Sequence, residues 1–269
     1  MSELLPILKW AGGKRQLLSA LKPLMPKHFN RYCEPFLGGG ALFFDLAYPK
    51  ALVNDVNCEL INFYEVVKND VGKLIETIQS FEDNEEFFYQ LRVLDRDKEK
   101  FSKFDKTFIA ARTYYLNRRC FNGLYRVTKK GYFNAPYGHY KTPLPLDIDN
   151  FKRIAEYLNQ NEITICSKSY LELENMFEDG DFVYFDPPYD NAFTQYHNSG
   201  FDYSNQQELK LLCDRLTELD IKFMLSNSAT DFILDLYKDY KCNLVTAKRN
   251  INSNASGRNG AKEVIITNY

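Results

Sequence analysis

Short apolar runs typical of buried strands alternate with amphipathic segments toward both ends of the chain. Five runs are predicted to be strands: 31–36, 51–55, 182–185, 222–226 and 263–267. Helical patterns accompany them at 41–46, 59–67 and 205–219. This alternation predicts an α/β fold with a mostly parallel sheet covered on both faces. Such sheets bind ligands at the carboxyl ends of their strands.

The middle of the chain has a different pattern. Residues 57–118 are predicted to be helical, with cap-like starts at Asp70 and Asn84. The segment 121–138 then combines Asn-Gly and Lys-Gly steps with flanking aromatic residues, which indicates a hairpin or a compact turn-rich loop. We therefore expect a catalytic domain formed by 1–56 and 160–269. A recognition domain, 57–159, interrupts it and carries the hairpin near 119–140.

Composition agrees with a folded intracellular protein. Hydrophobic residues make up 45% of the 269 residues, enough for a sizeable core. No stretch is apolar enough to cross a membrane, and the N-terminal segment lacks a signal-peptide profile. The six cysteines are scattered without metal-ligand spacing, so we expect reduced thiols, no metal site and a cytoplasmic location.

Charge is distributed unevenly along the chain. The net charge of −2 argues weakly against binding to a polyanion. However, the segment 106–146 holds eight Lys or Arg residues and no acidic residue, and 241–262 holds five more in a second acid-free run. This asymmetry allows a positive face that binds a polyanion, although a solvated basic loop would have the same composition.

Two glycine-containing segments suggest a ligand pocket. Gly38, Gly39 and Gly40 follow the first predicted strand, where the lack of a Cβ lets a ligand approach the backbone. Asp55, at the end of the next strand, suits a pair of ribose hydroxyls, so the two features together favour a nucleoside-containing cofactor. The segment 9–15 is not a P-loop, because Arg15 stands where that motif needs Ser or Thr.

The motif Asp186-Pro187-Pro188-Tyr189 follows the apolar run 182–185 and so ends a predicted strand. An exocyclic aromatic amine is a poor nucleophile because its lone pair is delocalised into the ring. A carboxylate and a backbone carbonyl that accept its two N–H bonds would raise the electron density on nitrogen. The two prolines restrict the direction of that carbonyl, and Tyr189 could stack on a base rotated out of a duplex.

These motifs together resemble the α-type DNA adenine-N6 methyltransferases, the Dam/DpnM-like family. The resemblance covers nearly the whole chain and keeps the order of the family's motifs. The matching segments are 9–14, 34–40, 54–55, 121–126, 133–138, 186–189 and 249–254. The resemblance implies a Rossmann-like methyltransferase fold with a seven-stranded sheet and S-adenosylmethionine as methyl donor. It also implies double-stranded DNA as substrate.

The resemblance also implies roles for individual residues. Catalysis would fall to Asp186, Pro187, Pro188 and Tyr189. The methyl donor would contact Trp10, Lys14, Phe36, Gly38, Gly40, Asp55 and Asp186. DNA would be bound by Lys9, Phe121, Asn122, Leu124, Arg126 and Pro136, with a GATC site as the expected target. We add Arg118, Arg119, Asn134 and His139 as candidates for DNA binding, because they lie in the same acid-free segment 106–146. His139 stands where many relatives have arginine, and the segment 190–195 looks shorter than usual.

Several alternatives remain open. The acceptor could be cytosine N4 or a protein glutamine, but those families usually have Ser or Asn at position 186. The same chemistry could act on another adenine-containing site, and a DNA-binding module without turnover is a further alternative. A cognate restriction endonuclease would be a functional partner. The sequence does not distinguish a restriction-modification enzyme from one that works alone.

Overall fold

The computed structural model describes residues 3–190, 201–247 and 261–269. The segment 249–254, and all but the first residue of 190–195, lie outside the described residues. No helix in the described part of the chain is long and apolar enough to span a membrane.

The fold is built on a seven-stranded sheet with the order β3-β2-β1-β4-β5-β7-β6. Its strands are β1 (Arg31–Glu34), β2 (Lys50–Asn54), β3 (Glu162–Cys166), β4 (Asp181–Phe185), β5 (Lys222–Ser228), β6 (Lys241–Ala247) and β7 (Ala261–Thr267). The pairs β1–β2, β1–β4 and β4–β5 are parallel, whereas β7 is antiparallel to both β5 and β6. The predicted α/β fold with a mostly parallel seven-stranded sheet is confirmed.

The structure contains all five strands that the apolar runs predict, and two more. β1 ends at Glu34, before Pro35, which has no N–H to donate to a neighbouring strand. The two strands without a predicted counterpart, β3 and β6, lie at the two edges of the sheet. Edge strands face solvent along part of their length and need fewer apolar residues, so their pattern is weaker.

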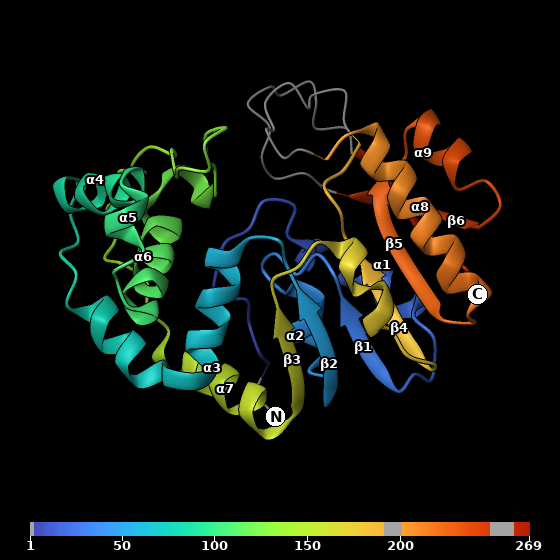
Figure 1. Ribbon diagram of the computed structural model, residues 1–269, viewed down its shortest axis with the longest axis horizontal. Coiled ribbons are helices and arrows are strands. Elements are labelled where there is room, and N and C mark those ends of the chain that lie inside the picture. The colour runs from blue at the N-terminus through green and yellow to red at the C-terminus, as the bar shows by residue number, and fades with distance from the viewer. Residues whose placement is uncertain (1–2, 191–200, 248–260) are drawn as a thin grey trace. The chain divides into compact units, whose positions relative to one another are not determined.

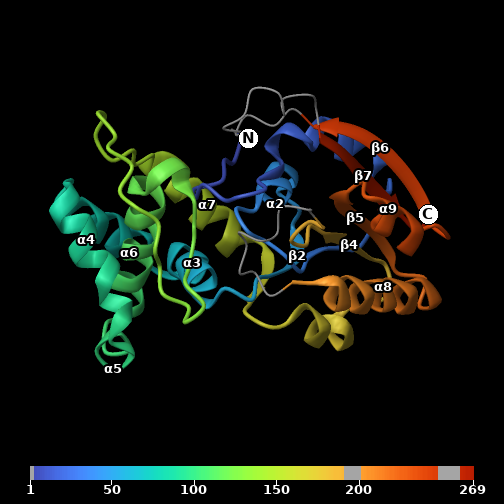
Figure 2. The same ribbon diagram turned by 90° about the horizontal axis from the view of Figure 1, so that it is seen from above.

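The chain forms two compact units, and one consists of residues 14–37, 50–56 and 168–269. It contains most of the sheet and the helices α1 (Leu18–Leu21), α8 (Tyr203–Glu218) and α9 (Asp231–Leu236). Three 3-10 helices belong to it: η1 (Lys14–Gln16), η2 (Lys22–Leu24) and η5 (Tyr170–Met176). α8 runs alongside β5 in both ribbon views (Figure 1 and Figure 2) and buries Leu209, Leu212 and Leu216.

The other compact unit consists of residues 1–13, 38–49 and 57–167. Its helices are α2 (Ala41–Leu46), α3 (Cys58–Gln79), α4 (Glu85–Val93), α5 (Lys98–Phe101), α6 (Lys106–Arg119) and α7 (Ile148–Gln160), with η3 (Leu94–Arg96) and η4 (Phe121–Gly123). α3 contains one residue with non-helical backbone angles, Asp70, where the sequence predicts a helix start. The predicted boundaries differ from these units, because 1–13, 38–49 and 160–167 pack with the inserted segment.

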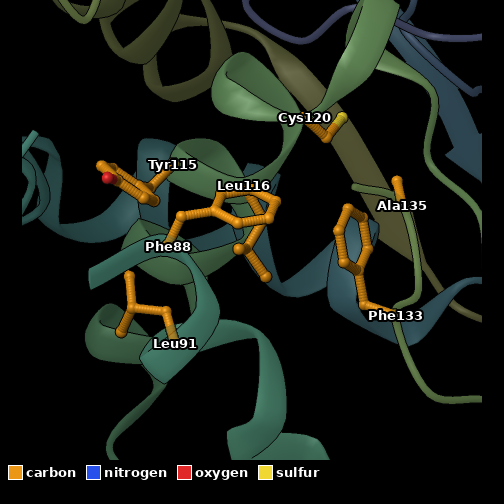
Figure 3. Close-up of a cluster of buried hydrophobic side chains, with 7 residues drawn as sticks. All are labelled: Phe88, Leu91, Tyr115, Leu116, Cys120, Phe133 and Ala135. Atoms are coloured by element: carbon orange, nitrogen blue, oxygen red, sulfur yellow. The ribbon is translucent and has the colours of Figure 1, made fainter. Parts of the chain in front are cut away.

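The predicted hairpin is present as a loop with little regular strand. Two isolated antiparallel bridges join Cys120 to Tyr137 and Val127 to Phe133. A buried cluster fixes the loop against α4 and α6 (Figure 3); its members are Phe88, Leu91, Tyr115, Leu116, Cys120, Phe133 and Ala135. Burying a side chain such as Phe133 contributes roughly 2 kcal/mol. Side-chain packing, more than strand pairing, therefore holds this hairpin.

Candidate active site

Three adjacent parallel strands, β2, β1 and β4, end at the same edge of the sheet. Asp55 follows β2 directly, Phe36 follows β1 after one proline, and Asp186 follows β4 directly. Because parallel strands have a common direction, these three candidate residues share the edge at which such folds bind ligands. Asn54 reinforces this edge, since its side-chain amide donates to the carbonyl oxygens of Pro35 and Lys168.

Asp186 forms an ion pair with Lys14, whose Nζ lies 2.9 Å from Oδ1 of the carboxylate. The same ammonium lies 4.4 Å from the centroid of the Tyr189 ring, a cation–π contact. Lys14 therefore contacts the first and the last residue of the Asp-Pro-Pro-Tyr motif.

Burial raises the pKa of Asp186 from its usual 3.8 to about 6. Lys14 acts in the opposite direction, because its positive charge favours the ionised carboxylate, while Glu263 adds to the increase. At neutral pH the carboxylate is therefore ionised, and it is more basic than an exposed aspartate. A carboxylate of raised basicity is a better hydrogen-bond acceptor for an amine.

The backbone after the two prolines is fixed by side chains of α8 and β5. Gln206 donates to the carbonyl oxygen of Pro188 at 3.0 Å, and Asn227 donates to Gln206 at 3.1 Å. Asn227 also accepts from the backbone N–H of Asp190, and Ser228 donates to the Asp190 carbonyl oxygen. Gln206 and Asn227 are buried, so this network of hydrogen bonds restricts the motion of the backbone at the end of the motif.

The sequence does not predict these supporting residues, nor does it predict Glu263, which accepts a hydrogen bond from the Tyr189 hydroxyl at 2.9 Å. A usable signal was present in β5, whose last residues are Ser226, Asn227 and Ser228. Polar side chains at the carboxyl end of a strand that neighbours the catalytic strand are candidates for such support. The signal for Glu263 is weaker, because its place between β5 and β6 emerges only in the folded sheet.

The glycine turn after β1 packs against Trp10. Gly38 and Gly40 both have positive φ, +49° and +68°, a region that favours glycine. A Cβ at Gly38 would lie 2.7 Å from Cδ1 of Trp10, so any other residue would displace the indole. The ring of Tyr125 also stacks on that indole, at 5.0 Å between centroids. Three of the candidate cofactor residues, Trp10, Gly38 and Gly40, thus belong to the same compact unit.

Lys9 is held by the buried side chain of Asn117. The Lys9 N–H donates to Oδ1 of Asn117 at 2.9 Å, and Nδ2 of Asn117 donates to the Lys9 carbonyl oxygen at 2.6 Å. The side chain of Lys9 packs on Gly123, at the start of the hairpin. Lys9 is therefore joined to the loop that carries the other candidate DNA-binding residues.

Most candidate DNA-binding residues lie on this loop. Phe121, Asn122, Pro136 and His139 are exposed, and Leu124 is half-buried. The Phe121 N–H donates to the carbonyl oxygen of Pro136 at 2.9 Å, which joins the two arms of the loop. Asn122 and His139 have positive φ, 56° and 51°, and His139 Nδ1 lies 3.6 Å from a carboxylate oxygen of Glu85.

Arg126 and Asn134 face each other across the hairpin. Nε of Arg126 donates to Oδ1 of Asn134 at 2.8 Å, and NH2 donates to the Asn134 carbonyl oxygen at 3.1 Å. Arg126 remains exposed, so its guanidinium is oriented before any ligand binds. Both residues are candidates for DNA binding from the sequence, and in the structure they contact each other.

The two arginines at the end of α6 have different environments. Arg118 is half-buried, whereas Arg119 is 1% exposed. Arg119 forms an ion pair with Asp83 and donates to the carbonyl oxygen of Thr142. These contacts support a structural role in attaching the loop, and we therefore leave Arg119 out of the proposed DNA surface.

The comparisons with known proteins agree with the chemistry of this site. Residues 10–251 match the family described as D12 class N6 adenine-specific DNA methyltransferase. The chain belongs to this family. It is therefore an adenine-specific DNA methyltransferase, and the resemblance drawn from the sequence motifs is confirmed.

Named relatives within the family match over nearly their whole length. The chain is 44% identical to the type II methyltransferase M1.LlaDCHI of Lactococcus lactis subsp. cremoris, over 98% of this chain and 95% of that protein. It is 39% identical to the type II methyltransferase M.MjaIII of Methanocaldococcus jannaschii, over 99% and 100%. It is 33% identical to the DNA adenine methylase of Escherichia coli K12, over 96% and 93%.

Proposed function

We propose that this methyltransferase transfers a methyl group from S-adenosylmethionine to N6 of an adenine rotated out of double-stranded DNA, within GATC sites. The observation that carries the proposal is the Asp186 carboxylate at the end of β4, with Tyr189 beside it and Lys14 in contact with both. This arrangement offers an acceptor for an amine and an aromatic face for a base.

The residues around the glycine turn fit the proposed donor. Gly38 and Gly40 form the turn after β1, where Trp10 packs on Gly38, and Asp55 follows β2, where a carboxylate can accept from ribose hydroxyls. We assign donor binding to these residues with Trp10, Lys14 and Phe36. When bound, S-adenosylmethionine would supply an electrophilic methyl group on a sulfonium centre.

In the proposed mechanism, Asp186 accepts a hydrogen bond from the N6 amine of adenine. The Pro187 carbonyl oxygen accepts the second, so that electron density on N6 increases as it attacks. Tyr189 stacks on the base and keeps N6 in line with the reacting methyl group. Because Gln206 holds the Pro188 carbonyl oxygen, the motif needs little rearrangement on binding.

We assign recognition of the DNA sequence to Lys9 and to the hairpin. Arg126 offers the paired donors that guanine O6 and N7 accept, and its contact with Asn134 orients the guanidinium. Phe121 is 55% exposed and is suited to fill the stack that a rotated adenine leaves. Asn122, Leu124, Pro136, His139 and Arg118 complete the proposed DNA surface.

Transfer from labelled S-adenosylmethionine to matched duplexes tests this assignment. One duplex carries a single GATC site, and the others differ from it by one base pair at each position of the site. The proposal expects label in the GATC duplex and a large loss in every other. Equal labelling of the duplexes that change a flanking G·C pair would contradict the GATC assignment while leaving adenine methylation intact.

A cognate restriction endonuclease is a further part of the proposal. Two relatives are named as type II methyltransferases, which supports a role as the protective partner of such an enzyme. Plasmid methylated by the protein should resist nucleases whose cleavage is blocked by N6-methyladenine within their site. Digestion with a panel of such nucleases identifies the protected sequence.

A further inference from the structure

Glu263 lies in the interior of the sheet near its antiparallel end. It belongs to β7, where it pairs in register with Ser228 of β5 and Val245 of β6. The residue is 7% exposed. A carboxylate at such a position loses much of its hydration, which costs free energy unless a hydrogen-bond donor compensates for it.

The donor is the hydroxyl of Tyr189, whose oxygen lies 2.9 Å from Oε2 of Glu263. Burial raises the pKa of the Tyr189 phenol well above its usual value, and the charges of Asp186 and Glu263 add to the increase. The phenol therefore stays protonated and donates over the whole physiological range. A hydrogen bond from a neutral hydroxyl to a carboxylate is stronger than one between neutral groups.

This bond fixes the Tyr189 ring at its far end. The near end is set by the backbone, because Gln206 binds the Pro188 carbonyl oxygen and Asn227 binds the Asp190 N–H. A ring held at both ends cannot rotate away from the position at which a base would stack. Lys14 contacts one face of the ring at 4.4 Å.

We propose that Glu263 is a positioning residue for methyl transfer: it holds the ring of Tyr189 and places a negative charge near Asp186. The inference rests on the proposed function, in which Tyr189 stacks on the target adenine. It assigns a role to a residue outside the Asp-Pro-Pro-Tyr motif, on the last strand of the sheet.

The electrostatic part of this role has a definite sign. The charged groups that act on Asp186 are Lys14 of η1, which lowers its pKa, and Glu263 of β7, which raises it. Removing the charge of Glu263 therefore makes Asp186 easier to ionise. The acidic limb of the pH–rate profile should move to lower pH in Glu263→Gln, whereas a merely structural residue would leave it in place.

The experiment measures kcat, KM for both substrates and the pH profile in the full-length protein. Glu263→Ala removes the acceptor and Tyr189→Phe removes the donor, so each should lower kcat about ten- to a hundredfold with a smaller effect on KM. The double variant should lose little more than either single variant, because both changes break the same bond. Glu263→Gln retains an acceptor oxygen, so its kcat should fall less while its acidic limb moves.

Ile266→Ala is the matched control, since it disturbs a buried position of β7 that pairs with Leu225 and Cys242 and not with the supporting network. It should lower the melting temperature and leave the pH profile unchanged. The inference is overturned if Glu263→Gln keeps the wild-type pH profile, or if the losses of Glu263→Ala and Tyr189→Phe multiply. If Glu263→Ala does not fold, Tyr189→Phe and Glu263→Gln still decide. A wild-type protein that makes no N6-methyladenine would overturn the proposed function as well.

Discussion

At the scale of single residues, the site depends on one carboxylate in a costly environment. Asp186 is 18% exposed at its side chain and is paired with a lysine that is itself buried. Burial still outweighs the ion pair, so the pKa of Asp186 is raised to about 6. The folded protein thus keeps an aspartate whose ionisation costs folding free energy, as functional sites commonly do.

Asp186→Asn should abolish methyl transfer and stabilise the protein. In the folded protein the pKa of Asp186 is above its usual 3.8, so ionisation of this carboxyl lowers the free energy of unfolding. This cost is absent below about pH 3.8 and is complete above about pH 6. At pH 7.5 the variant should gain at most about 3 kcal/mol, since one pKa unit corresponds to about 1.4 kcal/mol. Thermal unfolding of both proteins at pH 7.5 and pH 4 measures this. A gain that persists at pH 4 would contradict the explanation.

Lys14→Met should shift the pH profile in the direction opposite to Glu263→Gln. Without the ammonium, the ionised form of Asp186 loses its favourable neighbour, and the pKa of Asp186 rises above about 6. The acidic limb of kcat/KM should therefore move to higher pH. Arg15→Met, at the exposed neighbouring position, is the control and should leave the limb unchanged. If the acidic limb of Lys14→Met stayed at its wild-type pH, Lys14 would not influence the titration of Asp186.

Some of these residues could be predicted from the sequence and others could not. Asp186 and Tyr189 stand in a rare motif after an apolar strand, so sequence was sufficient to propose them. Glu263 could not be proposed, because its contact with Tyr189 spans 74 residues and depends on the pairing of β7. Arg119 was proposed from its position in a basic run, but the run does not reveal that Asp83 faces it.

At the scale of elements, the hairpin combines exposed tips with a buried base. Phe133 and Ala135 are in the hydrophobic cluster of Figure 3, whereas Phe121 and Arg126 face solvent. Asp95 accepts the N–H of Phe133 at 2.7 Å and pairs with the buried Arg112. An element built in this way presents exposed side chains on a fixed support, as the proposed reading of DNA requires.

Arg126→Ala should relax discrimination at one guanine by about 1–3 kcal/mol. The physical reason is the loss of two paired donors that Asn134 holds in place. Methylation rates on duplexes changed at single base pairs measure the effect. Lys129→Ala, an exposed change in the same hairpin, is the control and should weaken binding to all duplexes alike, with a smaller salt dependence. Uniform weakening by Arg126→Ala would instead make it a phosphate contact.

The elements were predictable where their pattern was strong. The helix at 41–46 has the predicted bounds, and the helix expected at 205–219 differs from α8 by at most two residues at each end. The hairpin was expected from its turn residues, but its weak strand pairing was not, because side-chain packing holds it. β3 and β6 were missed because edge strands carry a weaker apolar pattern.

At the scale of the whole molecule, the proposed function assigns chemistry and DNA recognition to different parts of the sequence. The Asp-Pro-Pro-Tyr motif and its supporting network lie in the unit that contains most of the sheet, and the acid-free run 106–146 lies in the other. The compact units did not follow the predicted domain boundaries, since 1–13 and 38–49 pack with the inserted segment. The composition of such short segments does not indicate that they pack with residues far from them in the sequence.

The most direct test is nucleoside analysis of DNA that the protein has methylated. Unmethylated duplex DNA is incubated with the protein and labelled S-adenosylmethionine, then digested to nucleosides and separated. We predict label in N6-methyladenine alone, and no label when Asp186→Ala replaces the wild type. Label in N4-methylcytosine, or N6-methyladenine formed at a normal rate by Asp186→Ala, would contradict this prediction.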